Sequence, residues 1–166
     1  MLENLLKKYN ELLNFDGKSD PEKIASLKRI FERDIKNNTN FKFRNKQINP
    51  VHTIDSIGID ILFDHLTTEI VSQETRKREF EKERSLRLHW IKYHIEETKK
   101  ECLEIFSVEE NGRFKTYIFD KNENYVIILE KYRKKEEYYL LTAYYLRGGN
   151  LRKIENKMRR KLDQVL

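Results

Sequence analysis

The stretch CLEIFSVEENGRFKTYIFDKNENYVIILEKYRKKEEYYLLTAYYLR, which runs from Cys102 to Arg147, decides the fold class of this chain. It holds four runs rich in β-branched and aromatic residues, and such runs favour strands. The runs lie near 102–108, 113–119, 125–132 and 138–146. Polar turns this short join neighbouring antiparallel strands, so the stretch predicts a four-stranded antiparallel β-meander.

Helical periodicity lies on both sides of this meander. Residues 1–36 contain two apolar stripes separated by the polar FDGKSD, which predicts an N-terminal helical hairpin. A single apolar stripe from about Glu81 to Lys99 predicts a long central helix. The basic segment LRKIENKMRRKLDQVL, after Gly148 and Gly149, predicts a closing C-terminal helix. Helices first, sheet second and a helix last define an α+β fold.

A polar break divides the chain into two parts. The sequence NNTN, Asn37 to Asn40, interrupts the helical pattern. We therefore expect an N-terminal helical extension over 1–40 and an α+β domain over 41–166. The segment FKFRNKQINP, which follows the break, indicates a short strand before Pro50. The length of 166 residues suits one domain of ordinary size.

The composition indicates a folded, highly soluble protein. Charged residues make up 37% and hydrophobic residues 38%, but the hydrophobic residues fall in periodic blocks that a disordered chain would lack. Lys and Arg exceed Asp and Glu by 34 to 28, for a formal net charge of +6, which favours polyanionic partners. Much of the excess sits in clusters that also fit a solvated surface. These clusters are Arg76-Lys77-Arg78, Arg133-Lys134-Lys135 and Arg159-Arg160-Lys161.

The cysteine count and the N-terminal segment bear on the compartment. Cys102 is the single cysteine, which excludes an intramolecular disulfide and a Cys-based zinc site. The opening MLENLLKKYNELLNF has no uninterrupted apolar stretch long enough for a signal peptide or a membrane span. We expect a cytoplasmic protein that does not associate with membranes.

The candidates for chemistry are few. The chain has no Walker loop, no Rossmann glycine pattern and no His-Glu-x-x-His, so nucleotide-cofactor and zinc-protease chemistry are disfavoured. Histidines are the natural proton carriers near neutral pH, and the four in the chain are His52, His65, His89 and His94. His65 is the most interesting, because it lies between polar neighbours in an otherwise apolar segment; His94 and His52 fit structural and loop roles better. No ligand spacing supports a metal site, and we expect no cofactor.

The last predicted strand, YYLLTAYYL, allows two interpretations. With a period of two, Leu140, Thr142 and Tyr144 share one face, while Leu141, Ala143 and Tyr145 share the other. A hydroxyl beside aromatic rings suits RNA, because it can bind a phosphate oxygen while the rings stack on unpaired bases. A tyrosine-rich strand that simply packs in the core is equally consistent with the pattern.

Two motifs in this order resemble a known group of nucleases. RSLRLHWIKYHIEE, Arg84 to Glu97, is followed by a meander that contains YVIILEKY and YYLLTAYYL. This arrangement resembles the phage-associated nuclease domains grouped with barnase, EndoU, the tRNA-cleaving colicins and RelE. The match covers roughly Ile57 to Leu146 and leaves the N-terminal hairpin outside it. The resemblance implies a barnase/RelE-like fold.

The resemblance also implies an activity and a set of site residues. The activity is metal-independent RNA cleavage, in which a ribose 2′-hydroxyl attacks the adjacent phosphate and leaves a 2′,3′-cyclic end. This chemistry needs a base, an acid, and cations around the charged transition state. The implied roles are a proton carrier (His65), a phosphate clamp (Arg87 or Arg84), a hydrogen-bond donor (Thr142), a stacking platform (Tyr144), an added charge (Lys131) and a weaker candidate base (Glu130).

Three function classes follow from these observations. The leading hypothesis is an endoribonuclease, either a toxin or a phage-borne RNase, with tRNA as a candidate substrate and an inhibitor or antitoxin protein as a candidate partner. The second is a non-catalytic accessory protein of a phage or mobile element that binds nucleic acid or protein. The third is an interaction adaptor that uses the hairpin at 1–36. The enzyme hypothesis predicts that His65, Arg87 and Thr142 converge on one cleft.

Overall fold

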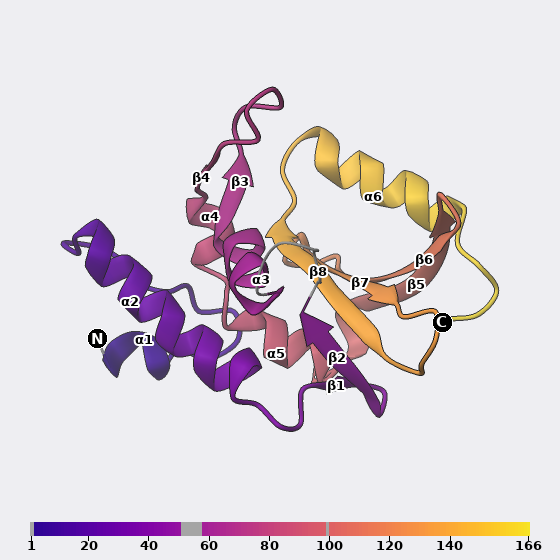
Figure 1. Cartoon of the computed structure of the whole chain (residues 1–166), viewed down its shortest axis with the longest axis horizontal. Coiled ribbons are helices and arrows are strands. Elements are labelled where there is room, and N and C mark those ends of the chain that lie inside the picture. Colours follow the sequence, from indigo (N-terminus) through magenta and orange to yellow (C-terminus); the bar gives the residue numbers. More distant parts are fainter. Residues whose placement is uncertain (1, 51–57, 99) are drawn as a thin grey trace.

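The computed structural model describes residues 2–50, 58–98 and 100–166. The described chain forms a curled, mixed six-stranded sheet in the order β1-β2-β8-β7-β6-β5 and a separate two-stranded sheet of β3 and β4. Helices α1 to α5 lie on one side of the large sheet, and α6 crosses the other side (Figure 1). His52 falls outside the described residues.

The strands of the large sheet are β1 (Lys42–Phe43), β2 (Lys46–Pro50), β5 (Leu103–Glu110), β6 (Arg113–Asp120), β7 (Tyr125–Lys131) and β8 (Tyr138–Tyr145). The small sheet pairs β3 (Thr68–Ile70) with β4 (Arg78–Phe80). The α-helices are α1 (Leu2–Leu5), α2 (Asp20–Phe31), α3 (Gly58–Thr67), α4 (Lys82–Ser85), α5 (Trp90–Ile95) and α6 (Gly149–Arg159). A π-helical turn, η1 (Glu32–Lys36), extends α2, and a 3₁₀ turn, η2 (Lys100–Cys102), precedes β5.

The prediction of a four-stranded antiparallel sheet is wrong, because two further strands extend it. β5 to β8 pair antiparallel in chain order, but β2 then adds to β8 in parallel, with Ile48 opposite Tyr138. β1 and β2 form a hairpin whose two loop residues, Arg44 and Asn45, have φ values of 49° and 67°. Positive φ at both positions is typical of the tight turn that matches strand twist. The hairpin covers the edge of β8, whose backbone groups would otherwise lack partners.

The predicted N-terminal helical hairpin is also wrong. α1 is a single turn, and residues 6–19 are irregular before α2 begins after the Ser19 capping box. Leu6 is 78% exposed, so the apolar stripe of an amphipathic helix does not form. Contacts to the rest of the chain hold this segment instead: Leu13 N donates to the carbonyl of Leu86, and Trp90 Nε1 donates to that of Glu11. Tertiary hydrogen bonds thus replace the helical ones.

The predicted long central helix is broken into α4 and α5. Between them the backbone makes short-range bonds, with Arg87 N donating to Arg84 O and Trp90 N to Arg87 O. Residues 85–91 are all buried, so this stretch has no solvated face of the kind that a long amphipathic helix presents. Because of the break, Arg84 and Arg87 point in different directions: Arg84 lies over the ring of Tyr144 and Arg87 lies over that of Tyr145.

Two buried clusters lie on the two faces of the sheet. In β7, Ile127 belongs to the cluster on the helical side, whereas Val126 and Ile128 belong to the cluster under α6. This is the alternation expected of a strand covered on both faces. From the first forty residues, Leu27 and Ile30 of α2 lie in the same cluster as Ile127, so this segment contributes to the core on the helical side.

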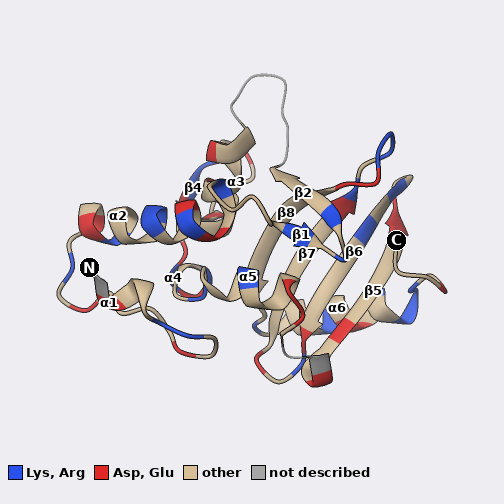
Figure 2. Ribbon diagram, turned by 90° about the horizontal axis from the view of Figure 1, so that it is seen from below, with Lys and Arg blue, Asp and Glu red and all other residues tan. Residues whose placement is uncertain are grey.

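The charged residues are interspersed over the fold. In α2 the first turn is acidic and the last turn is basic, so this helix carries both red and blue segments (Figure 2) and is not a uniformly basic surface. Among the described residues, no helix is long and apolar enough to cross a membrane.

Candidate active site

A cavity of about 450 Å³ lies where the end of α3, the β3–β4 hairpin and β8 meet. We call it the histidine cavity, because His65 of α3 lines it. Three arginines, one carboxylate and the polar part of β8 complete its wall. The lining residues are His65, Glu69, Ile70, Arg76, Arg78, Arg84, Leu141, Thr142 and Tyr144.

A β-bulge at Leu141 orients the imidazole of His65. Along β8, Leu140 pairs with Leu129 and Thr142 pairs with Ile128, which leaves Leu141 as the extra residue. His65 Nδ1 lies 3.2 Å from the carbonyl oxygen of Leu141. Because a carbonyl can only accept, Nδ1 carries the hydrogen, and Nε2 of the neutral ring keeps its lone pair. The bulge therefore selects the tautomer in which Nε2 is the base.

The bulge also shifts the alternation expected along β8. Leu140 and Ala143 lie together in the helical-side cluster, whereas Leu141 and Tyr144 pack against the cluster under α6. A strict period of two would have put Leu141 and Ala143 on the same face. The inserted residue moves the side chains that follow it to the opposite face of the strand. Thr142, next to the bulge, faces the end of α3.

The surroundings of His65 favour its neutral form. Burial lowers the pKa of His65 below its ordinary value of 6.5, and the nearby cations Arg78 and Arg84 act in the same direction. The hydrogen bond to Leu141 opposes them without reversing the direction. His65 is therefore largely unprotonated at neutral pH, as a general base must be.

Arg84 and Thr142 hold the backbone beneath His65. An Nη of Arg84 donates to the carbonyl of His65 at 2.6 Å and to that of Thr68 at 2.9 Å. The hydroxyl of Thr142 donates to the same His65 carbonyl at 3.3 Å. Carbonyls at the end of a helix lack intrahelical partners, so these donors cap α3. Arg84 also lies over the ring of Tyr144, 5.4 Å from its centroid.

Arg78 and Arg76 add two cations from the β3–β4 hairpin. Arg78 donates to the hydroxyl of Thr68 at 2.8 Å and to its carbonyl at 2.9 Å, which fixes the guanidinium against the start of β3. Arg76 is exposed at the rim. Arg84 Nε is buried without a hydrogen-bond partner among the described residues. Together the three guanidinium groups make the cavity suitable for an anion.

Arg87 and Lys131 do not line the histidine cavity. Arg87 is 8% exposed, pairs with Glu83 at 2.7 Å and lies over the Tyr145 ring, 4.1 Å from its centroid. Lys131, at the end of β7, lines a different cavity of about 330 Å³ together with Glu130. The structure thus gathers His65, Arg84, Thr142 and Tyr144 and leaves out Arg87, Lys131 and Glu130.

Sequence reasoning missed Arg78 and Glu69 as site residues. Both belong to the β3–β4 hairpin, which was not expected in so charged a stretch. Two signals were available: the β-branched residues of TTEIV, and the basic cluster at 76–78, which fits a polyanionic partner as well as a solvated surface.

The other described histidines have structural positions. His89 is fully buried, with Nε2 3.0 Å from the carbonyl of Lys8. His94 is 2% exposed, and its Nε2 lies 3.0 Å from Asp120 Oδ2. Within the described residues, no three His, Cys, Asp or Glu side chains are grouped so as to hold a metal ion.

Comparison of the chain with protein-family models, with curated proteins and with solved structures gave no significant match. The resemblance to the barnase, EndoU, colicin and RelE group therefore stays a prediction from the motifs.

Proposed function

We propose that the protein is a metal-independent endoribonuclease, a toxin or phage-borne RNase of the kind grouped with barnase and RelE. The observation that carries this proposal is the histidine cavity, in which His65 with an unprotonated Nε2 lies among Arg76, Arg78 and Arg84. A neutral base beside cations is what 2′-hydroxyl attack on a phosphodiester requires. We propose a cytoplasmic site of action, because that is where this class of substrate occurs.

Each group has a defined step in this reaction. His65 Nε2 takes the proton of the ribose 2′-hydroxyl, and the 2′-oxygen forms a bond to the adjacent phosphorus. The bond from phosphorus to the 5′-oxygen breaks, and this oxygen takes up a proton from water or from a side chain of the cavity. The products are a 2′,3′-cyclic phosphate and a 5′-hydroxyl. Arg84 and Arg78 stabilise the extra negative charge on the phosphate oxygens, and Tyr144 offers a ring for base stacking.

The proposal predicts RNA cleavage without divalent metal. Incubation of the purified protein with total tRNA and with unstructured RNA in EDTA is expected to give fragments that end in 2′,3′-cyclic phosphate. The ends can be identified by mass spectrometry. Intact RNA under all these conditions would remove the enzymatic assignment. Cleavage that leaves 3′-hydroxyl ends would instead contradict the 2′-hydroxyl mechanism.

The lowered pKa of His65 predicts the acid limb of the pH profile. A general base acts only when it is unprotonated, so kcat/KM should be constant at neutral pH. It should fall tenfold per pH unit once the pH drops below the pKa of His65, which lies under 6.5. The measurement is kcat/KM on a short RNA between pH 4.5 and 8. A rate that rises as the pH falls from 6.5 would mean that protonated His65 is needed, as an acid.

A specific observation favours the non-catalytic alternative. The cavity around Lys131 also contains Arg133, Lys134 and the edge-to-face ring pair of Tyr132 and Tyr139, whose centroids are 5.2 Å apart. Cations beside aromatic rings are enough to bind single-stranded nucleic acid or an acidic partner such as an inhibitor protein, without catalysis. RNA binding without cleavage in the EDTA experiment would support this alternative.

A further inference from the structure

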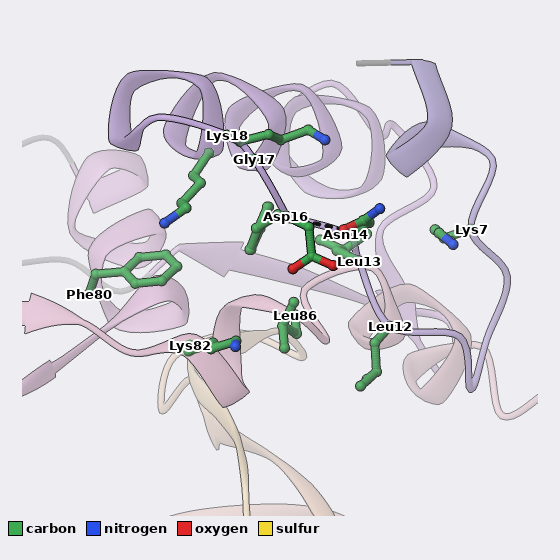
Figure 3. Close-up of a pocket in the computed structure, with 12 residues that line it drawn as sticks. Lys7, Leu12, Leu13, Asn14, Asp16, Gly17, Lys18, Phe80, Lys82 and Leu86 are labelled. Carbon is green, nitrogen blue, oxygen red and sulfur yellow. Dashed lines mark hydrogen bonds between the residues drawn. The ribbon is translucent and has the colours of Figure 1, made fainter.

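A second cationic cavity, of about 530 Å³, lies between the irregular segment before α2 and the junction of β4 with α4. We call it the lysine cavity, because Lys7, Lys18, Lys23 and Lys82 line it. In Figure 3, Lys18 and Lys82 come from opposite walls, Asp16 lies between them, and Phe80 closes one end.

The cavity has an excess of positive charge. Its lining holds four lysines against the single carboxylate of Asp16. Lys18 and Lys82 take part in no ion pair among the described residues. Lys7 and Lys23 each have a carboxylate neighbour outside the lining, at 3.8 and 3.5 Å. A concave surface of one sign concentrates its field and attracts ligands of the opposite sign.

An exposed aromatic ring lies beside these cations. Phe80 is 43% exposed although it ends a strand, and the ring of Phe15 supports it edge-to-face, with centroids 6.2 Å apart. Leu12, in the same lining, is 41% exposed. Exposed apolar groups within a cationic cavity indicate a ligand that carries both anionic and flat apolar parts.

The segment from β4 to α4 contributes residues to the lining of both the lysine cavity and the histidine cavity. Arg78 and Arg84 line the histidine cavity, whereas Phe80 and Lys82, which lie between them in the chain, line the lysine cavity. Residues two apart in a strand are only about 7 Å apart. A flexible chain of nucleotides held by Arg78 can therefore continue past Phe80.

We propose that the lysine cavity binds the unpaired nucleotides that flank the cleaved bond, so that the substrate is single-stranded RNA of several nucleotides. This inference rests on the proposed function of the histidine cavity. Lys18 and Lys82 bind backbone phosphates, and Phe80 stacks on a base, a combination that binds single strands with little sequence preference. Asp16 accepts hydrogen bonds from the amino group of a base or from a ribose 2′-hydroxyl.

The test measures RNA binding separately from cleavage. The probe is a fluorescent 12-nucleotide 2′-O-methyl RNA, which lacks the attacking hydroxyl, and its affinity is read by anisotropy over a range of salt. The double variant Lys18→Gln/Lys82→Gln is expected to bind at least tenfold more weakly than the wild type. Loss of two phosphate contacts should also reduce the slope of log K against log salt by about 1.4, since each contact with a single strand contributes roughly 0.7.

A matched control removes the same charge elsewhere. Lys42→Gln/Lys153→Gln changes two exposed lysines on β1 and α6 and should lower the affinity less than threefold. Phe80→Ala is expected to weaken binding about tenfold at every salt concentration, because it removes stacking and no charge. Thermal unfolding of each variant checks that the fold is retained.

The outcomes separate this inference from the proposed function. If Lys18→Gln/Lys82→Gln binds the probe as tightly as Lys42→Gln/Lys153→Gln does, the flanking site is overturned even though RNA cleavage stands. If the protein cleaves no RNA but the first double variant binds more weakly, the enzymatic proposal fails and the lysine cavity remains a nucleic-acid site.

Discussion

Replacing His65 with alanine is expected to lower kcat for RNA cleavage by about 10²- to 10⁴-fold, the usual contribution of a general base. The reason is the loss of Nε2, the basic nitrogen left when Nδ1 donates to the Leu141 carbonyl. RNA affinity should change little, because the cations of the histidine cavity remain. Single-turnover cleavage with enzyme in excess measures the chemical step directly.

Two further variants sharpen this test. His65→Gln can still donate from its side-chain amide to Leu141 but cannot take up a proton at neutral pH, so it should be as inactive as His65→Ala. Lys131→Ala is the control, because Lys131 lies outside the histidine cavity and should keep kcat within threefold of the wild type. Full activity in His65→Gln would show that the residue only positions the Leu141 backbone.

The positions of Arg84 and Arg87 show why sequence could identify part of the site and not all of it. Residues three apart on one helix share a face, so a continuous helix over 81–99 would present both arginines together. The helix instead breaks after Ser85. Arg84 therefore lies over Tyr144 and Arg87 over Tyr145, two neighbours that point to opposite faces of β8. Nothing local in the sequence indicates the break, which depends on burial from all sides.

The sheet likewise has some features that the local sequence predicts and others that depend on residues far apart in the chain. Turn residues and β-branched runs locate the strands from β5 to β8, because these signals are local. The parallel pairing of β2 with β8 joins residues about ninety positions apart, so no local pattern specifies it. The bulge at Leu141 is equally hidden, because YYLLTAYYL contains no glycine to mark it. His65 was identified because a polar residue in an apolar segment needs a partner, and the bulge carbonyl is that partner.

The largest stability loss is expected from Asp120→Asn, at about 2–4 kcal/mol, because each buried donor left without an acceptor costs roughly 1–3 kcal/mol. Asp120 is fully buried and accepts four hydrogen bonds. Oδ2 receives the Tyr9 hydroxyl and His94 Nε2, and Oδ1 receives two backbone N–H groups of the turn after β6. Asparagine has one accepting oxygen and one donating nitrogen, so two of the four donors would face another donor.

The control for this variant is a carboxylate on the adjacent strand. Glu104 of β5 pairs with Lys121 at 2.7 Å, but both side chains are more than 40% exposed. Exposed pairs contribute little, so Glu104→Gln should cost less than about 1 kcal/mol. Urea unfolding at pH 7 compares the two variants. If Asp120→Asn and Glu104→Gln lower the free energy of unfolding equally, the buried network around Asp120 contributes no more to stability than a surface ion pair.

The pH dependence of unfolding tests the same network. Burial acts to raise the pKa of Asp120, but the hydrogen bonds from His94, Tyr9 and the turn outweigh it and lower this pKa from 3.8 to about 2. A carboxyl whose pKa is lower in the folded state stabilises the fold fully above its unfolded pKa, and this contribution is lost as the pH falls. The difference in unfolding free energy between the wild type and Asp120→Asn should therefore be constant above about pH 4 and shrink between pH 4 and 2. A difference that stays constant down to pH 2 would show that Asp120 does not titrate in this window, and that packing or turn geometry causes the loss in the asparagine variant.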